Sequence, residues 1–201
     1  MKTGDYAAIV LAAGFSSRMD GFKVTLPLGG VTLTEHVIST FLQNDVEVYL
    51  VVGYRQDEVR AATRKLKINV VENPDYRYGM FTSVQAGARK LRADHRGFFV
   101  LPVDIPLVMP ATIARLMNEA EKHPDSIIYP VFNGRRGHPP LIPSALIPTI
   151  VGWNKDGGLK AVLSTYEESV LNVVVTDSNI LFDIDTPGDY KELLDRFQRL
   201  Q

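Results

Sequence analysis

Short apolar runs rich in β-branched residues alternate along this chain with segments whose apolar residues recur every three or four positions. The apolar runs predict strands at residues 7–11, 46–52, 68–71, 98–102, 126–131 and 171–175. The periodic segments predict helices at residues 33–43, 56–65, 82–92, 110–122, 143–150, 159–166 and 187–200. Alternation of strands and helices is typical of βαβ units, so we expect an α/β fold with a mainly parallel central sheet.

The alternation changes after residue 131, where a turn-forming cluster at 133–137 separates the apolar stretches 129–132 and 140–142. This pattern predicts a small, hairpin-like β excursion from the main sheet near residues 129–142. No repeat or linker divides the 201 residues, so we expect a single domain spanning residues 1–201. Ligands of open α/β sheets bind beyond the carboxyl ends of the strands, which directs attention to the loops there.

Composition narrows the classes of function. The chain has no cysteine, which excludes disulfides, thiolate metal sites and a cysteine nucleophile. Its net charge is -1, so a basic site must be local, and we expect no nucleic-acid partner. No apolar run approaches the roughly 20 residues of a membrane span, and no apolar signal segment precedes the first strand. We therefore expect a cytoplasmic protein without membrane association.

The first candidate site is the stretch I-V-L-A-A-G-F-S-S-R-M-D-G-F-K at residues 9–23. An apolar strand enters a turn of small residues at Ala12, Ala13 and Gly14, and such a turn exposes backbone N–H groups that can hold phosphate oxygens. Arg18 and Lys23 supply two cations, as a nucleoside triphosphate requires. The glycine spacing matches neither a P-loop nor a dinucleotide-binding fingerprint. The alternative is an ordinary strand followed by a solvated basic turn.

Carboxylates follow two further apolar runs. Asp104 ends the run V-L-P-V-D, and Asp183 and Asp185 lie in F-D-I-D-T-P, where an extended chain places both on one side. Asp104 and one of this pair could share Mg²⁺, which takes one or two protein carboxylates together with water and substrate phosphates. The alternative for Asp104 is a cap of the helix near Pro110. The alternative for Asp185 is a cap of the helix that begins at Pro187.

Two other loops carry polar groups. Gly79 permits close backbone approach, and Thr82 and Ser83 place hydroxyls at a helix N-terminus, which favours anions or polar ligand edges. Thr82 could equally be an ordinary helix cap. Further along, His138 follows a basic turn that contains Arg136, and both could meet the phosphate of an acceptor. A structural role for the histidine and a solvated role for the arginine are the alternatives.

These residues resemble a known family. L-A-A-G-x-S-S-R-M with a lysine shortly after it resembles the signature of the molybdenum-cofactor nucleotidyltransferases and is most similar to their cytidylyltransferase branch. The similarity continues, in the order of the family, through L-P-L-G-G at 26–30, N-P-D to G-M at 73–80, D-x-P at 104–106, R-G-H-P at 136–139 and D-I-D-T-P at 183–187. The resemblance thus covers nearly the whole chain and implies a three-layer α/β/α, Rossmann-like nucleotidyltransferase fold.

The resemblance also implies a reaction, in which a nucleotidyl group passes from CTP to the phosphate of molybdopterin and pyrophosphate is released. CTP is favoured because the guanylyltransferase branch has an extra glycine beside the turn at 12–14, which gives a purine more room. A molybdoenzyme or its chaperone is the implied protein partner. The rival functions are a nucleotidyltransferase acting on a sugar- or polyol-phosphate and a non-catalytic nucleotide-binding chaperone. A nicotinamide oxidoreductase is a third rival, which the missing glycine fingerprint disfavours.

Site residues follow from the resemblance, position by position. The implied catalytic residues are Lys23, Arg18 and Asp104. The implied nucleotide-binding residues are Leu11, Ala12, Ala13, Gly14, Ser16, Ser17, Arg18, Lys23, Gly79 and Ser83. The implied acceptor-binding residues are Arg136 and His138, and the implied ligands of Mg²⁺ are Asp104 and Asp185.

Overall fold

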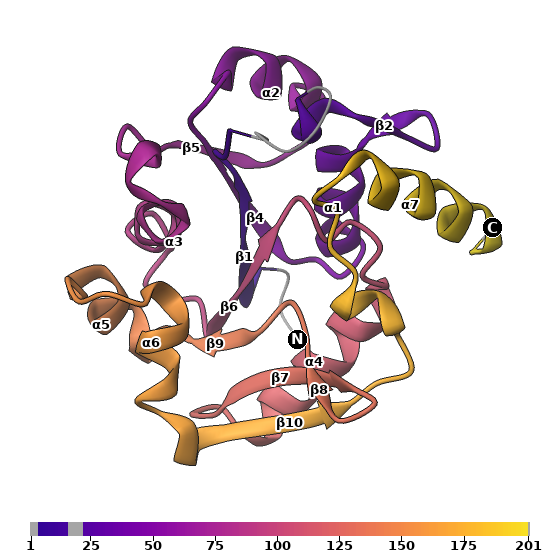
Figure 1. Cartoon of the computed structure of the whole chain (residues 1–201). Helices are drawn as coiled ribbons and strands as arrows, with labels where there is room; N and C mark the ends of the chain where they lie inside the picture. Colours follow the sequence, from indigo (N-terminus) through magenta and orange to yellow (C-terminus); the bar gives the residue numbers. More distant parts are fainter. Residues whose placement is uncertain (1–3, 16–21, 201) are drawn as a thin grey trace.

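The computed structural model describes residues 4–15 and 22–200. In this part of the chain one sheet has the strand order β10-β7-β9-β6-β1-β4-β5, with β8 paired to β7 (Figure 1). Its strands are β1 (Tyr6–Ala12), β4 (Glu47–Val52), β5 (Asn69–Glu72), β6 (Gly97–Pro102), β7 (Ile127–Phe132), β8 (Arg135–Arg136), β9 (Leu141–Pro143) and β10 (Val170–Val174). β1 runs parallel to β4 and β6, β5 to β4 and β10 to β7, whereas β9 is antiparallel to β6 and β7. The sheet is mainly parallel, as predicted.

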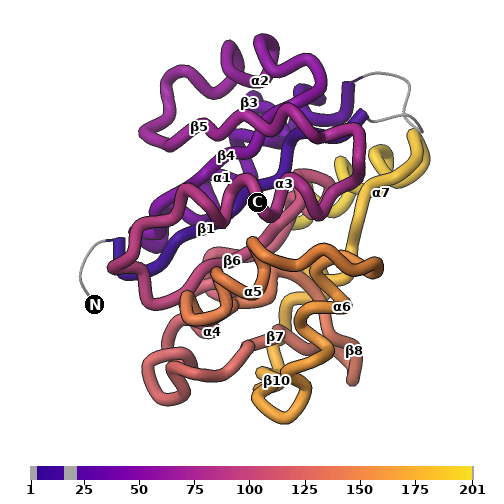
Figure 2. The backbone as a smooth tube through the Cα atoms, turned by 90° about the vertical axis from the view of Figure 1, so that its left-hand side faces the viewer, coloured from indigo at the N-terminus to yellow at the C-terminus, as the bar shows by residue number. Residues whose placement is uncertain are grey.

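Helices cover both faces of this sheet. On one face lie α1 (Leu33–Leu42), α2 (Gln56–Thr63) and α4 (Pro110–Lys122). On the other lie α3 (Met80–Ala88), α5 (Ile147–Gly152) and α6 (Gly158–Ser164), which Figure 2 shows in front of the sheet. α7 (Pro187–Arg199) packs with the hairpin of β2 (Pro27–Leu28) and β3 (Val31–Thr32). No helix in the described part of the chain is long and apolar enough to cross a membrane.

Burial along β1 explains how the three layers are held together. No residue of β1 is more than 6% exposed. Val10 belongs to the apolar cluster that the sheet forms with α1 and α4, and Ile9 belongs to the cluster formed with α3, α5 and α6. Because both faces of the strand are covered, its sequence is a continuous apolar run rather than an alternating one. The three-layer α/β/α architecture is confirmed.

The structure corrects several details of the sequence prediction. The β excursion near 129–142 is present as the β7–β8 hairpin, but β9 lies inside the main sheet, between β6 and β7. Only Asn133 and Gly134 form the turn, both with positive φ, whereas residues 135–136 form β8. The helix predicted at 82–92 is α3, which begins at Met80 and ends at Ala88. The β2–β3 hairpin was not predicted, because strands of two residues are too short to show an alternating pattern.

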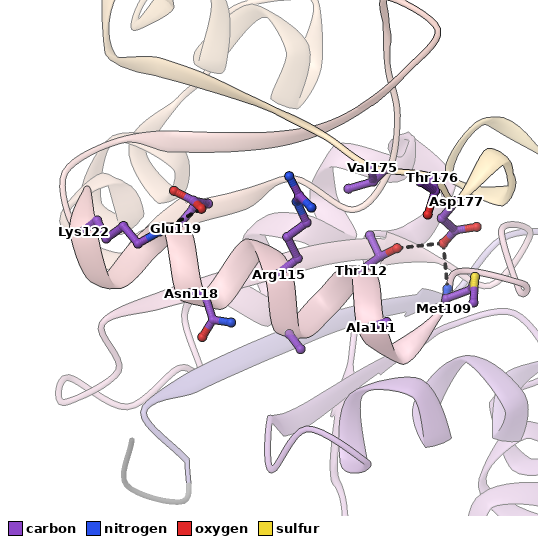
Figure 3. Close-up of a pocket in the computed structure, with 11 residues that line it drawn as sticks. Met109, Ala111, Thr112, Arg115, Asn118, Glu119, Lys122, Val175, Thr176 and Asp177 are labelled. Atoms are coloured by element: carbon purple, nitrogen blue, oxygen red, sulfur yellow. Dashed lines mark hydrogen bonds and ion pairs between the residues drawn. The ribbon is translucent and has the colours of Figure 1, made fainter.

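Asp177 fastens the C-terminal part of the chain to α4 (Figure 3). One carboxylate oxygen accepts the Met109 N–H at 2.8 Å and the Thr112 hydroxyl at 2.9 Å. The other accepts the backbone N–H and the side-chain amide of Asn179, both at 3.0 Å. Asp177 is buried, and the first N–H groups of a helix have no acceptor within the helix. The carboxylate therefore caps α4 from a distant part of the sequence and fixes the start of the segment that leads to Asp183.

Replacing this anchor should destabilise the protein. Asp177→Ala should lower the free energy of unfolding by about 3 kcal/mol, because it leaves several buried donors without an acceptor. Urea denaturation followed by circular dichroism measures the loss. The control is Asp125→Ala, which removes an exposed carboxylate and should stay within about 0.5 kcal/mol of the wild type. Equal stability of the two variants would contradict the anchoring role.

Candidate functional site

The candidate site lies at the carboxyl ends of β1 and β6, in the middle of the sheet. The chain passes from β1 to β4 on one side and later returns to β6 on the other, and α/β sheets bind ligands at such a switch point. A cavity of about 300 Å³, here called the small cavity, opens there. It is lined by Leu11, Ala12, Ala13, Gly14, Phe15, Lys23, Val24, Tyr76, Arg77, Gly79, Met80, Ser83, Pro102, Val103 and Asp104.

Lys23 places a positive charge in the wall of the small cavity. It begins the 3-10 turn η1 (Lys23–Thr25), and only 8% of its surface is exposed. Its Nζ lies 3.8 Å from Oδ2 of Asp104 and 3.2 Å from Oδ1 of Asp185. The two carboxylates compensate an ammonium group whose burial would otherwise be costly, and they hold it at the end of the sheet.

A backbone hydrogen bond brings these two carboxylates together. The Ile184 N–H donates to the Asp104 carbonyl oxygen over 2.9 Å. The Ile184 side chain is fully buried in an apolar cluster with Leu28 and Leu193. The segment after η5 (Ser178–Leu181) is thus fixed against the loop after β6, and Asp185 follows directly from it.

The helix-cap alternatives for the two carboxylates are not observed. The N-cap of α7 is Thr186, whose hydroxyl accepts the Asp189 N–H while the Asp189 carboxylate accepts the Thr186 N–H. Pro187 occupies the first turn of α7, as predicted. At α4 the capping carboxylate is that of Asp177. Asp104 and Asp185 are therefore directed to Lys23 rather than to a helix end.

Negative charge is in excess around Asp104. Burial raises the pKa of Asp104 above its ordinary value, Lys23 opposes the shift, and the carboxylates of Asp185 and Asp183 add to it. Within residues 4–15 and 22–200, three carboxylates thus act on one another against a single nearby ammonium group. Such a surplus favours the binding of a further cation.

Gly79 and Ser83 form another part of the wall, at the start of α3. Gly79 has φ of 107°, a conformation that L side chains rarely adopt, and it ends the turn η2 (Tyr76–Tyr78) just before the helix. Ser83 is 3% exposed and accepts a hydrogen bond of 2.9 Å from the Asn73 side-chain amide. Thr82 accepts from the same amide, and its hydroxyl donates back to the Asp75 and Gly79 carbonyl oxygens.

A second cavity of about 680 Å³, here called the large cavity, adjoins the first. The two cavities share Leu11, Met80 and Pro102 in their walls. The remaining residues of the large cavity are Phe81, Val84, Val100, Tyr129, Arg136, Gly137, His138, Pro140, Gly158, Leu159, Lys160, Leu163, Ser164 and Glu167. Most of this wall is apolar, so the large cavity suits a ligand with a sizeable ring system and few charged groups.

The charge of Arg136 is compensated inside the large cavity. Its guanidinium donates to Glu167 at 3.1 Å and to the Asn172 side chain at 2.7 Å, and it lies over the Tyr129 ring, 5.2 Å from the centroid. Lys160, by contrast, has no hydrogen-bond or ion-pair partner among the described residues.

A backbone hydrogen bond fixes the position of His138. Its N–H donates to the Ile180 carbonyl oxygen over 2.9 Å. Gly137 permits this approach, because a Cβ there would lie 2.5 Å from the same oxygen. Burial lowers the pKa of His138 below its ordinary value, against the opposing effects of Asp183 and of a backbone hydrogen bond with Val100. The imidazole is neutral at neutral pH and has one N–H donor and one acceptor.

The structure brings most of the sequence-predicted residues into these two cavities. The small cavity contains Leu11, Ala12, Ala13, Gly14, Lys23, Gly79, Ser83 and Asp104, and the large cavity contains Leu11, Arg136 and His138. Asp185 joins the small cavity through Lys23. The predictions for Ser16, Ser17 and Arg18 fall on residues 16–21, outside the described part of the chain.

Sequence reasoning assigned no role to Lys160, Glu167 or Asp177, and it named Asn73 only within the family motif N-P-D to G-M at 73–80. Asn73 and Asp177 share a signal that could have found them, since each is a polar residue just after an apolar strand. Glu167 gives no such signal, because its partner Arg136 is 31 residues away in the sequence.

Comparison with known proteins gives a consistent family. Residues 8–170 match the MobA-like NTP transferase domain. The molybdenum cofactor cytidylyltransferase of Escherichia coli (strain K12) is 31% identical, over 96% of this chain and 97% of that protein. Nicotine blue oxidoreductase of Paenarthrobacter nicotinovorans is 29% identical, over 92% of this chain and 95% of its own length. A solved nucleotidyl transferase from Methanothermobacter thermautotroptrophicus is 25% identical with a TM-score of 0.83, over 98% of this chain and 99% of that one.

The matched region contains both cavities: the turn after β1, Lys23 and Asp104 on one side, and Arg136 and His138 on the other. The resemblance seen in the sequence is thereby confirmed, and this chain is a nucleotidyltransferase that belongs to the MobA-like NTP transferase family.

Proposed function

We propose that this nucleotidyltransferase transfers the cytidylyl group of CTP to the phosphate of molybdopterin, with Mg²⁺ as cofactor and pyrophosphate as the second product. The observation that carries the proposal is the joining of two unlike cavities. The small one holds a fixed cation, Lys23, and the larger one beside it is mostly apolar. A charged donor and a ring-containing acceptor would meet at their shared wall. The Escherichia coli relative is named a molybdenum cofactor cytidylyltransferase, and this name supports the choice of both substrates.

The chemistry asks little of the side chains beyond position and charge. An oxygen of the acceptor phosphate forms a bond to the α-phosphorus of CTP, the bond to the bridging oxygen breaks, and pyrophosphate leaves with the electron pair. A phosphate is already ionised near neutral pH, so no general base is needed. Lys23 would neutralise the triphosphate, and the turn at Ala12 to Gly14 would align it through backbone N–H groups.

The described residues fit a magnesium ion. Asp104 and Asp185 would hold it, because they converge on one point and carry more negative charge than Lys23 balances. Two carboxylates suit Mg²⁺, which takes one or two protein carboxylates and keeps water and phosphate oxygens in its shell. When bound, Mg²⁺ supplies additional neutralisation of the triphosphate charge.

The small residues of the turn support CTP as donor. Ala13 is 3% exposed and lines the small cavity. Its methyl group packs closely against Gly53, where an added Cβ would lie 3.0 Å from it. Ala13 therefore cannot move away from the cavity to make space for a larger base. A difference of about one methyl group gives roughly 10- to 200-fold discrimination between ligands. CTP is therefore proposed as the preferred donor.

The defining experiment is a pyrophosphate-release assay with Mg²⁺ and each of the four ribonucleoside triphosphates. Molybdopterin is compared with sugar and polyol phosphates as acceptor. We expect release with CTP and molybdopterin above every other pair. Release only with a sugar or polyol phosphate would favour the rival transferase, and CTP binding without release would favour a cofactor-delivering chaperone. Oxidation of a nicotinamide cofactor in place of release would favour the third rival, a nicotinamide oxidoreductase; the Paenarthrobacter relative is likewise named an oxidoreductase.

Lys23→Ala should lower turnover by about 10²- to 10³-fold, the usual cost of losing one preorganised electrostatic group. The pyrophosphate assay measures the rate, and circular dichroism checks that the fold persists. Lys67→Ala removes an exposed lysine outside both cavities and should leave the rate unchanged. A turnover near that of the wild type for Lys23→Ala would refute the role of this lysine.

Asp104→Asn should stabilise the protein at neutral pH while it impairs activity. Because the pKa of Asp104 is raised in the folded protein, its neutral form is favoured by folding, and this contribution is lost as the pH rises through the folded-state pKa. Thermal unfolding should show a higher Tm for the variant at pH 7, and the difference should shrink as the pH falls through the raised folded-state pKa and vanish once the pH is below the unfolded-state value of about 4. A lower Tm for the variant at pH 7 would contradict the charge surplus at this site.

A further inference from the structure

Tyr54 lies in the loop between β4 and α2 and contacts two aromatic residues that are close to the turn after β1 and to Lys23. The centroid of its ring is 5.2 Å from that of Phe15 and 5.9 Å from that of Phe22. Phe15 directly follows the turn, and Phe22 directly precedes Lys23. One ring therefore joins the two described parts of the chain on either side of residues 16–21.

The backbone beside this ring is docked on the turn after β1. The Tyr54 N–H donates to the Ala13 carbonyl oxygen over 3.2 Å. Gly53 permits the approach, because a Cβ at this position would lie 2.7 Å from Cβ of Tyr76 and 3.0 Å from the Ala13 methyl group. Tyr76 also contacts Phe15, with 5.4 Å between the ring centroids. The turn is thus fixed to this loop through its backbone and through Phe15.

Phe22 holds the chain just before Lys23. It is 6% exposed and belongs to an apolar cluster against which Tyr54 also packs. Its ring is nearly perpendicular to that of Tyr54, with an interplanar angle of 79°, and the Arg55 guanidinium lies over it, 4.8 Å from the centroid. Phe22 lines neither cavity, whereas Lys23 lines the small one. Phe22 can therefore act on a ligand only through Lys23.

The ring of Tyr54, rather than its hydroxyl, makes these contacts. Among the described residues the hydroxyl has no hydrogen-bond partner. Tyr54 lines neither cavity, so it would not touch a ligand bound in them. Any effect of this side chain on a ligand must pass through Phe15 and Phe22.

We propose that Tyr54 is a positioning residue that holds the turn at Ala12 to Gly14 and Lys23 at the separation that the phosphates of a nucleoside triphosphate require. The turn would bind phosphate oxygens through backbone N–H groups and Lys23 through its ammonium group, so the ligand needs both at once. Because both are held before the ligand arrives, less conformational entropy is lost on binding. The inference rests on the proposed use of a nucleoside triphosphate and adds a residue outside the cavities that supports it.

The test separates the ring of Tyr54 from its hydroxyl. Tyr54→Leu keeps an apolar side chain but loses both ring contacts, whereas Tyr54→Phe keeps the ring. Isothermal titration calorimetry with Mg²⁺ and without acceptor measures the Kd of CTP and of inorganic tripolyphosphate. Tyr54→Leu should weaken the binding of both ligands by a similar factor of about tenfold, because the defect concerns the phosphates alone. Tyr54→Phe should stay within about twofold of the wild type for both ligands.

Phe22→Leu tests the same contacts from their other side, through a residue that also lines neither cavity. It should weaken the binding of both ligands by about three- to fivefold, since it removes one of the two ring contacts of Tyr54. In the double variant with Tyr54→Leu, the loss should stay near about tenfold rather than reach the product of the two factors. If Tyr54→Leu does not fold, Phe22→Leu with the same two ligands takes its place.

Phe41→Leu is the matched structural control. It removes a contact of the same kind, with the Phe99 ring at 5.5 Å, and Phe41 lines neither cavity. Thermal unfolding should show a lower Tm for this variant, while both Kd values should stay within about twofold of the wild type. A purely structural role of Tyr54 would give the same combination, a lower Tm with unchanged Kd values.

The outcomes separate this inference from the proposed function. Unchanged binding of tripolyphosphate in Tyr54→Leu overturns the inference, and so does a loss in Tyr54→Phe as large as that in Tyr54→Leu. A wild type that does not bind both ligands overturns it as well. A wild type that binds CTP but releases no pyrophosphate with molybdopterin refutes the proposed transfer, whereas the role of Tyr54 is still measured by binding alone.

Discussion

The burial of β1 on both faces is the constraint on which the rest of the molecule depends. A strand that is dry along its whole length must be covered by helices on both faces, and its parallel neighbours β4 and β6 end at the same edge of the sheet as β1 does. The chain can leave that edge only through loops, so the turn after β1, the loop after β6 and the loop after β5 all meet there. The order and direction of the strands therefore determine where the site lies.

The charges at this edge of the sheet do not balance one another. Asp104 and Asp185 are brought together by a backbone hydrogen bond and an apolar anchor, Ile184, and their mutual repulsion is only partly offset by Lys23. The anchoring at Asp177 acts in the opposite sense, because that carboxylate is fully engaged by buried donors. One end of the C-terminal segment thus stabilises the fold, and the other end adds to an excess of negative charge around Lys23.

The helices and strands could be predicted well from the sequence, whereas the pairing of strands and the contacts between distant side chains could not. β1, β6 and α4 have long, unmistakable patterns, and the small-residue turn with Lys23 carries a local signature of phosphate binding. The insertion of β9 between β6 and β7 could not be predicted, since its pairing is decided by strands distant in the sequence. The charge compensation of Arg136 could not be predicted either. The local sequence suggests a free cation, but in the structure Glu167, which is distant in the sequence, neutralises it. Contacts across the chain, rather than local preference, decide these features.

The apolar wall that the two cavities share has a consequence for side reactions. Leu11, Met80 and Pro102 offer no group in their side chains that could activate or hold a water molecule. A nucleotide in the small cavity would face hydrocarbon until an acceptor filled the neighbouring space. No side chain of this shared wall could act as a general base toward water, so hydrolysis of the donor would need a group from elsewhere in the small cavity.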